Sequence, residues 1–177
     1  MNHLATSKED ILAASRDLIK ENGWAAVSIR AVASRCSVSA GTIYNYYESK
    51  ADLLSDTIES IWHEIFFHPE AEQVFHDVES CISWIYERLE YGNSQFPGFF
   101  SLHSFGFMRD EKTSGKKKMM QTWGHILNGL CEVLENDPKV RLDVFDKEFT
   151  EKKFADILFS LILVSMIRQD YDSSSVL

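Results

Sequence analysis

Three serines divide residues 28–50 into short helical pieces, and this segment constrains the fold of the chain more than any other. Ser28, Ser39 and Ser49 each precede a helix-compatible pattern, and a serine hydroxyl is a favoured N-cap because it accepts a hydrogen bond from a free backbone amide. Cys36-Ser37 interrupts the first pattern. The predicted inward-facing residues are Ile29, Val32, Ala33, Ile43 and Tyr47. We therefore predict two short helices around a tight turn, followed by a third helix from Ser49.

Two short helices around a turn are used most often to place the second helix in the major groove of DNA. In the second predicted helix Ala40, Gly41 and Thr42 lie outside the buried face, and their small size lets the helix N-terminus approach a base edge or a phosphate. The pattern therefore predicts a helix-turn-helix unit that binds DNA. The alternative is three ordinary short helices in an all-helical core, since capping boxes are common.

Residues 7–54 resemble the N-terminal DNA-binding domain of TetR-family transcriptional regulators. The positions that carry the resemblance are Asn22-Gly23, Ser28, Arg30, Ala33, residues 38–44, Tyr46-Tyr47, Ser49-Lys50 and Leu53-Leu54. One departure lies in the turn, where the family usually has Ala-Gly and this chain has Cys36-Ser37. A non-glycine residue at positive φ is mildly strained, so the departure puts the angle between the two helices in doubt.

The resemblance implies which residues meet DNA. Arg30 is the expected base reader because its planar guanidinium can pair with guanine O6 and N7, and Asn45 is expected to face adenine. Tyr46 and Lys50 are expected to hold phosphates, contacts that position a protein without specifying sequence. The complete set of implied DNA-binding residues is Ser28, Arg30, Ser39, Ala40, Gly41, Thr42, Tyr44, Asn45, Tyr46 and Lys50.

Charge is distributed unevenly along the chain. The formal net charge is −9, although residues 1–50 carry six basic and five acidic side chains and are therefore +1, which leaves −10 for the remainder. An acidic body behind a nearly neutral DNA-binding domain disfavours non-specific attachment to polyanions. We expect specific DNA binding in which each protomer neutralises few phosphates.

Composition predicts an all-α chain with a DNA-binding domain at residues 1–50 and a regulatory and dimerisation domain at residues 51–177. Of 177 residues 45% are hydrophobic, only 3 are proline, and extended β-rich stretches are missing. We expect a linking helix from Ser49 to about residue 67, a helix after Pro69, a break between Gly92 and Gly98, and helices near 116–135 and 154–167. The N-terminus lacks an apolar export signal, so we expect a cytoplasmic protein with reduced thiols at its three isolated cysteines.

Residues 154–167 are hydrophobic on nearly every face but too few to span a bilayer, which needs about 20 residues. A helix that is apolar all round must be covered all round, and we expect a second copy of the chain to cover one side. With the 116–135 helix it would form a four-helix interface of the kind that TetR-like proteins use. The alternative is burial within one subunit. The candidate interface residues are Trp123, Leu127, Leu130, Leu134, Leu158, Leu161, Ile162 and Ser165.

The resemblance also implies a small-molecule site in the larger domain, because TetR-like regulators commonly bind an effector there. A ligand that prefers the released arrangement then weakens operator binding by its differential affinity for the two arrangements. The candidate pocket residues are Trp62, Phe66, Trp84, Phe99, Phe100, His103, Phe107 and Trp123. An aromatic stripe at helical spacing is, as the alternative, ordinary core.

Enzymatic patterns are weak in this chain. His63 and His68 lie at i, i+5, which points them in different directions around a helix, whereas two zinc ligands on one helix need i, i+4. Glu59 and His63 do have the i, i+4 spacing and could share a cation. We predict no enzyme activity and no cofactor. We predict instead a homodimeric regulator, a repressor released from a palindromic operator by an apolar or aromatic ligand. The alternative is a DNA-binding protein without a small ligand, controlled by a protein partner.

Overall fold

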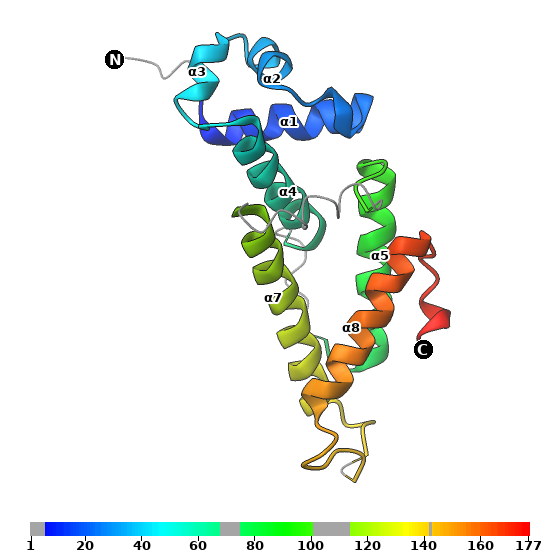
Figure 1. Ribbon diagram of the computed structural model, residues 1–177. Helices are drawn as coiled ribbons and strands as arrows, with labels where there is room; N and C mark the ends of the chain where they lie inside the picture. Colours follow the sequence, from blue (N-terminus) through cyan, green and yellow to red (C-terminus); the bar gives the residue numbers. More distant parts are fainter. Residues whose placement is uncertain (1–5, 68–74, 101–113, 142) are drawn as a thin grey trace.

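The computed structural model describes residues 6–67, 75–100, 114–141 and 143–177, and these ranges contain helices and no strand (Figure 1). The helices are α1 (Lys8–Asn22), α2 (Ile29–Arg35), α3 (Ala40–Tyr44), α4 (Lys50–Phe66), α5 (Val78–Gln95), α7 (Ser114–Asn136) and α8 (Glu151–Arg168), with 3-10 turns at Trp24–Ala26 and Ser173–Ser175. We call the described residues up to Lys50 the head and α5, α7 and α8 the body. The predicted all-α fold is confirmed.

The predicted caps define the head. The Oγ atoms of Ser28, Ser39 and Ser49 accept hydrogen bonds from the backbone amides three residues later, at 3.1, 3.2 and 3.1 Å. The five residues predicted to face inward are all buried. Each cap satisfies a backbone amide that helix geometry leaves free, and loss of such a cap costs about 1 kcal/mol. Local sequence therefore fixes where these short helices begin.

The tight turn between α2 and α3 contains Ser37 at φ 56°. The left-handed conformation that usually requires glycine is thus kept with a serine in its place. The amide of Val38 donates to the carbonyl of Ala33 at 2.9 Å, which closes the turn. The departure from the usual turn sequence therefore leaves a tight turn in place.

Helix α4 runs from the head into the body, where it packs against α7 and α5 (Figure 1). It ends at Phe66, close to the predicted residue 67. Its buried residues are Leu53, Leu54, Ser55, Thr57, Ile61, Trp62, Ile65 and Phe66. Their distribution around the helix places α4 in the core of both parts, so α4 is the mechanical link between them.

An aromatic cluster joins the head to the body. The rings of Trp62 of α4, Phe99 and Phe100 pack on one another, with centroids 5.1 to 5.6 Å apart, and Trp24 of the head lies 6.2 Å from Phe99. Lys20 of α1 is placed over the ring of Phe96 at 4.9 Å. These aromatic contacts add to the burial of apolar area and fix the orientation of the head on α4.

A buried hydrogen bond joins helices α5 and α8 in the body. The hydroxyl oxygens of Tyr86 and Ser165 are 2.8 Å apart, and both side chains are buried. The predicted break between Gly92 and Gly98 is confirmed, but it begins after Gln95, where α5 ends, rather than at Gly92. A Cβ at Gly92 would lie 2.6 Å from Cδ1 of Ile65, so glycine serves here for close approach of α5 to α4 rather than as a helix stop.

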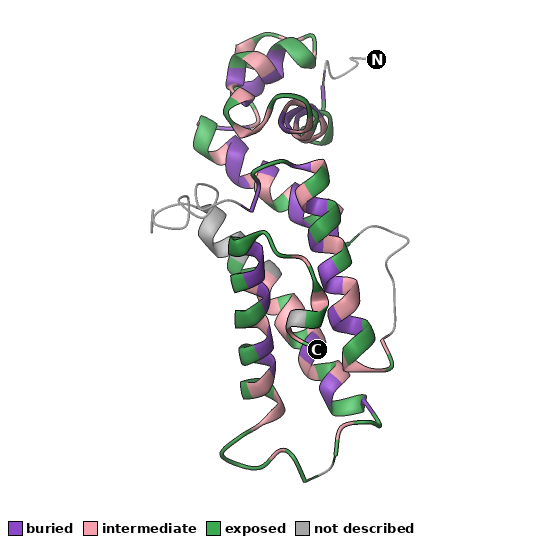
Figure 2. Ribbon diagram, turned by 90° about the vertical axis from the view of Figure 1, so that its right-hand side faces the viewer, coloured by how far each residue is buried: buried purple, intermediate pink, exposed green. Residues whose placement is uncertain are grey.

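The apolar side chains of α8 lie on two faces of the helix, one buried and one exposed. Leu158, Ile162 and Ser165, predicted at a dimer interface, lie instead in the core of the protomer, as do Leu130 and Leu134 of α7. Figure 2 shows this division between buried and exposed faces along the helices of the body. The exposed large apolar residues of α8 are Ile157, Leu161, Val164 and Ile167. Of the predicted α8 set, Leu161 alone faces outward. Among the described residues, no helix is long and apolar enough to cross a membrane.

Candidate DNA-binding surface and cavity

The helix-turn-helix lies at the end of the molecule farthest from the body (Figure 1). None of the ten predicted DNA-binding residues is buried. Arg30, Ser39, Gly41, Tyr44, Asn45 and Lys50 are exposed, and Ser28, Ala40, Thr42 and Tyr46 are half-buried. The head thus brings together, on α2, α3 and the start of α4, the side chains that the sequence singled out.

The basic side chains of α1 and α2, apart from Arg30, are paired with carboxylates of α1 and α4. Arg16 and Lys20 bind the carboxylate of Glu64 at 3.1 and 2.7 Å, whereas the guanidinium of Arg35 binds Glu21 and the ammonium of Lys8 binds Asp56. The bond from Arg35 lowers the pKa of the Glu21 carboxyl below its usual range.

Arg30 and Lys50 differ from the other four basic residues of the head. In the described part of the chain neither side chain is engaged in an ion pair or a hydrogen bond. Both are exposed. A cation without an internal partner gains the most by meeting a phosphate or a guanine edge. Of the six basic residues of the head, these two are therefore the ones available to an external anion.

Four of the predicted contact residues have side-chain hydrogen bonds within the head, namely Ser28, Ser39, Thr42 and Tyr46. The hydroxyl of Tyr46 donates to the backbone carbonyl of Thr6 at 2.7 Å and thereby holds the start of α1 against the end of α3. Its proton is therefore not free for a phosphate in this arrangement, and we assign Tyr46 a positioning role. The hydroxyls of Ser39 and Thr42 lie 3.0 Å apart, so each also has a partner within α3.

A cavity of about 620 Å³ lies in the body between the end of α4, the first half of α5 and the second half of α7. Volumes of this size are typical of drug-sized ligand sites. Burial raises the pKa of the Cys81 thiol in its wall to about 11, so this group is a neutral thiol rather than a nucleophilic thiolate. The aromatic residues in the wall are Phe66, Phe67, Phe75 and Trp84, and the polar ones include His76, His125, Glu132 and Asn136.

Most of the residues predicted to line the ligand pocket do not line this cavity. Of the predicted residues, Phe66 and Trp84 line it. Trp62, Phe99 and Phe100 belong instead to the aromatic cluster that joins head and body, because they pack on one another. Trp123 packs on Phe159 of α8 at 5.7 Å. The predictions for His103 and Phe107 lie outside the described residues. Sequence periodicity missed His76, Phe67 and Phe75, which lie near the α4–α5 connection rather than on a helical stripe.

The end of α4 connects the cavity to the head. Glu64 binds Arg16 and Lys20 of α1, and two residues later Phe66 lines the cavity. From the body, the guanidinium of Arg88 on α5 donates to the backbone carbonyls of Glu64 and Ile65. A shift of this helix end would therefore disturb bonds to both the head and the body.

A cation site at Glu59 and His63 is not supported by the structure. The described residues contain no group of three or more histidine, cysteine, aspartate or glutamate side chains placed to hold a metal ion. The ring of His63 instead lies 5.5 Å from that of Phe67.

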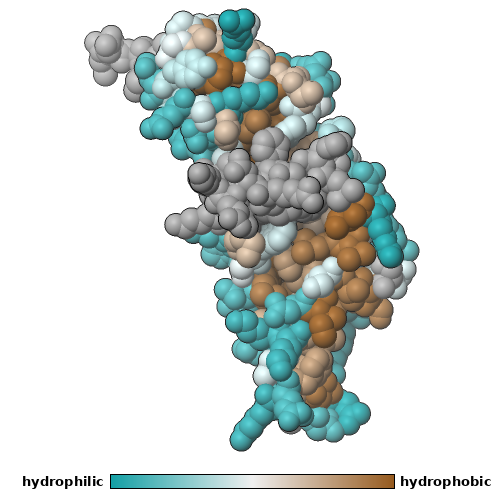
Figure 3. Space-filling view, in the orientation of Figure 1, coloured by the Kyte–Doolittle hydropathy of each residue, from teal (hydrophilic) through white to brown (hydrophobic). Residues whose placement is uncertain are grey.

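Exposed apolar side chains gather on one face of the body. Ile157, Leu161, Val164 and Ile167 are each 41–50% exposed. Their spacing of three or four residues places them on one stripe of α8. Figure 3 shows the corresponding hydrophobic patch on the face turned toward the viewer, where α8 lies in Figure 1. Isolated exposed apolar residues are normal, whereas a continuous stripe of this kind is a candidate interaction surface.

Comparison with known proteins identifies a family for the N-terminal part of the chain. Residues 11–57 match the family model described as bacterial regulatory proteins of the tetR family. Over 48 residues the chain is 38% identical to the HTH-type transcriptional regulator UidR of Escherichia coli strain K12, a stretch that covers 27% of this chain and 24% of that relative. The match thus spans about a quarter of the curated relative's length.

Solved structures resemble the whole chain at low sequence identity. A TetR transcription regulator from Haloarcula marismortui has a TM-score of 0.71 at 19% identity and covers 96% of this chain and 90% of its own. A transcriptional regulator from Rhodococcus sp. has a TM-score of 0.67 at 17% sequence identity, and the match covers 96% of this chain and 86% of that protein. FadR of Bacillus subtilis, solved in complex with stearoyl-CoA, has a TM-score of 0.61 at 18% sequence identity, and the match covers 96% of this chain and 95% of that protein. The two-part helical fold is therefore shared beyond the head.

Proposed function

The chain belongs to the TetR family of bacterial regulatory proteins through its N-terminal domain, and from this premise we propose that it acts as a dimeric, sequence-specific repressor. In this proposal two heads bind successive major grooves of a palindromic operator. A small apolar or aromatic effector in the body cavity releases them.

The availability of Arg30 and Lys50 is the observation that carries the proposal. These exposed cations flank the short helix α3, and the other four basic residues of the head are held in ion pairs. Arg30 is suited to guanine through its two-pronged guanidinium, and Lys50 to a phosphate as a point charge. With few base-reading side chains per head, sequence selection depends on a second head.

The exposed stripe of α8 supports dimerisation through the body. A second copy of the same stripe is its natural partner, since a two-fold interface uses the same surface twice. Two-fold symmetry would also present the heads to the half-sites of a palindrome.

The connection between the cavity and Glu64 supports release by an effector. A ligand that contacts Phe66 and prefers a shifted end of α4 would favour an arrangement in which the heads no longer fit the operator. Coupling energies of this kind are about 1–3 kcal/mol, which corresponds to a 5- to 150-fold change in operator affinity.

Selection of bound fragments from a random double-stranded DNA pool tests this function. We expect the wild-type chain to enrich a palindrome at about physiological salt, where non-specific binding is weak. A pool selected by the Arg30→Ala variant should lose preference at one base pair of each half-site, whereas the Arg35→Ala variant, which changes an ion-paired arginine on the same helix, should retain it. A folded dimer that enriches no sequence would contradict the proposal.

A further inference from the structure

We propose that the body cavity binds an organic cation, a molecule with a positively charged nitrogen on an aromatic or apolar body. The inference rests on the proposed function only in taking this cavity as the effector site. Nothing in the family assignment specifies the charge of the effector, which we infer from the cavity wall.

Aromatic rings form much of the wall. The ring centroid of Trp84 lies 5.8 Å from that of Phe66 and 5.3 Å from that of Phe75, and all three residues line the cavity together with Phe67. The faces of such rings carry negative potential, so they attract a cation placed within about 6 Å. Several rings around one volume are the arrangement that binds alkylated ammonium groups.

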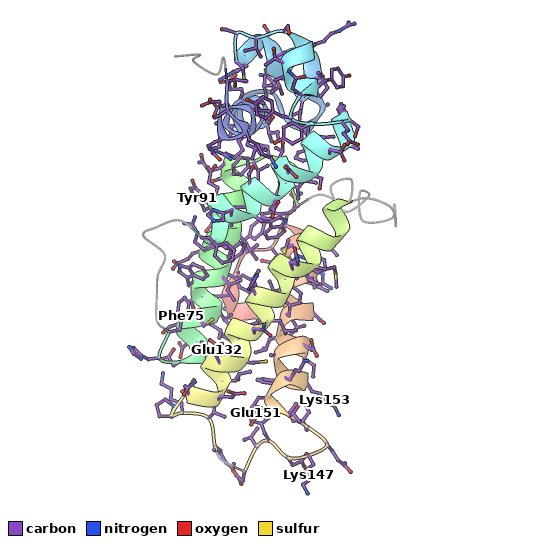
Figure 4. All side chains as sticks on the ribbon, turned by 90° about the vertical axis from the view of Figure 1, so that its left-hand side faces the viewer. Phe75, Tyr91, Glu132, Lys147, Glu151 and Lys153 are labelled. Atoms are coloured by element: carbon purple, nitrogen blue, oxygen red, sulfur yellow. The ribbon has the colours of Figure 1, made fainter. Side chains whose placement is uncertain are left out.

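The formal charge of the wall is negative. Glu132 is a lining residue, and the described residues that line the cavity include no lysine or arginine. Figure 4 shows Phe75 and Glu132 on the side of the body where α5 and α7 lie next to each other. In the described part of the chain Glu132 has no ion-pair partner. A carboxylate beside apolar walls favours a ligand that brings its own positive charge.

A lysine next to the cavity wall in the sequence is already engaged. Lys139 follows the lining residue Pro138, but its ammonium binds the Asp77 carboxylate at 3.1 Å. This pairing leaves the rim of the cavity without a free ammonium from that segment.

The negative charge of the chain outside the head also favours a cationic ligand over an anionic one. Residues 51–177 carry −10, which raises the local concentration of cations and repels anions. The Bacillus subtilis FadR structure contains stearoyl-CoA, whose phosphates would need basic partners. The wall described here supplies no lysine or arginine for such an anion, so the cavity is suited to the opposite charge.

Calorimetric titration of the full-length protein with three matched naphthalene compounds tests the proposal without DNA. The probes are naphthalen-2-ylmethyl-trimethylammonium, naphthalen-2-ylmethanol and naphthalene-2-acetate, which share one ring system and differ in charge. We expect the cation to bind at least fivefold more tightly than the neutral alcohol, and the acetate to bind most weakly. Equal affinities, tighter binding of the acetate, or no binding of the cation would each overturn the proposal.

Two variants separate the contributions of the Glu132 carboxylate and the Trp84 ring to the preference for a cation. Glu132→Gln should weaken cation binding about threefold to fivefold, as expected for an exposed charge pair, and leave the alcohol unchanged. Glu135→Gln, three residues along α7 and outside the cavity wall, is the control and should change neither. Trp84→Leu keeps an apolar wall but removes a ring face, so it should reduce the ratio of cation to alcohol affinity. An unchanged ratio in both Glu132→Gln and Trp84→Leu would contradict the inference.

Operator release provides a separate readout. If the acetate binds best and releases DNA, the cavity is an effector site but the inferred charge is wrong. If the cation binds and no DNA sequence is ever enriched, the cavity chemistry is right and the proposed function is wrong.

Discussion

Replacement of Leu161 by glutamate tests whether the exposed stripe of α8 holds two protomers together. Leu161 lies in the middle of the stripe and is 43% exposed in the single chain. Its neighbours on the stripe are Ile157, Val164 and Ile167, exposed by 48%, 41% and 50%. Because the outward part of each side chain has no partner within the described protomer, the substitution should leave the fold intact and change only association.

The expected size of the effect follows from these exposures. Complete burial of such a side chain contributes about 1.5–3 kcal/mol, so covering the exposed half contributes about 0.7–1.5 kcal/mol. Eight side chains from two protomers then contribute about 6–12 kcal/mol, against an association cost of about 4–15 kcal/mol. Loss of Leu161 from both copies removes about 1.5–3 kcal/mol, which weakens the dimer roughly 10- to 150-fold before the repulsion of two new carboxylates is added.

Sedimentation velocity across a range of micromolar concentrations measures this change. The wild type should be dimeric where the Leu161→Glu variant is monomeric, and the variant should bind an operator only with the affinity of a single head. Val144→Glu is the matched control, because Val144 is 46% exposed but lies in the connection before α8. Circular dichroism melting should give both variants the wild-type helix content. A folded Leu161→Glu variant that dimerises as tightly as the wild type would refute the proposed interface.

Three further predictions concern the head and the body. Arg30→Ala should cost about 1–3 kcal/mol of specific binding, measured by fluorescence anisotropy on the selected operator, and an equal loss on unrelated DNA would contradict base reading. Lys50→Ala should weaken binding to all sequences alike and lower the salt slope by about one per head, whereas Lys153→Ala at the far end of the body should not. Hydrogen bonds from Ser80 and then Lys139 lower the pKa of Asp77 from 3.8 to about 2. The stabilisation this implies is complete above about pH 4 and is lost as pH falls toward 2, so Asp77→Asn should flatten the acid side of the melting-temperature profile, and an unchanged profile would contradict this.

The head was predicted in detail because its determinants are local. A serine cap acts on an amide three residues away, and the buried face of a short helix is set by residues at i, i+3 and i+4. Ser28, Ser39 and Ile43 could therefore be assigned from sequence alone. The internal bond of Tyr46 to Thr6 could not, because it joins residues 40 positions apart.

The body was predicted less well because periodicity loses its meaning where a helix is apolar on almost every side. In α8 the sequence could not distinguish Leu158, which is buried, from Leu161, which is exposed. The packing of α8 against α7, together with the hydrogen bond between Ser165 and Tyr86 of α5, decides which face turns inward. The aromatic residues of the body are equally hard to assign from sequence, because the same helical spacing is found in residues that form the core and in residues that line a cavity.

The sequence by itself determined the helical class and the helix-turn-helix, and it predicted Arg30 and Lys50 among the residues that meet DNA. The tertiary structure alone decided that Lys8, Arg16, Lys20 and Arg35 are held in ion pairs, which face of α8 is exposed, and which aromatic residues surround a cavity. Caps and short-range spacing act within a few residues, whereas ion pairs, buried faces and cavities depend on segments that folding brings together from distant parts of the chain.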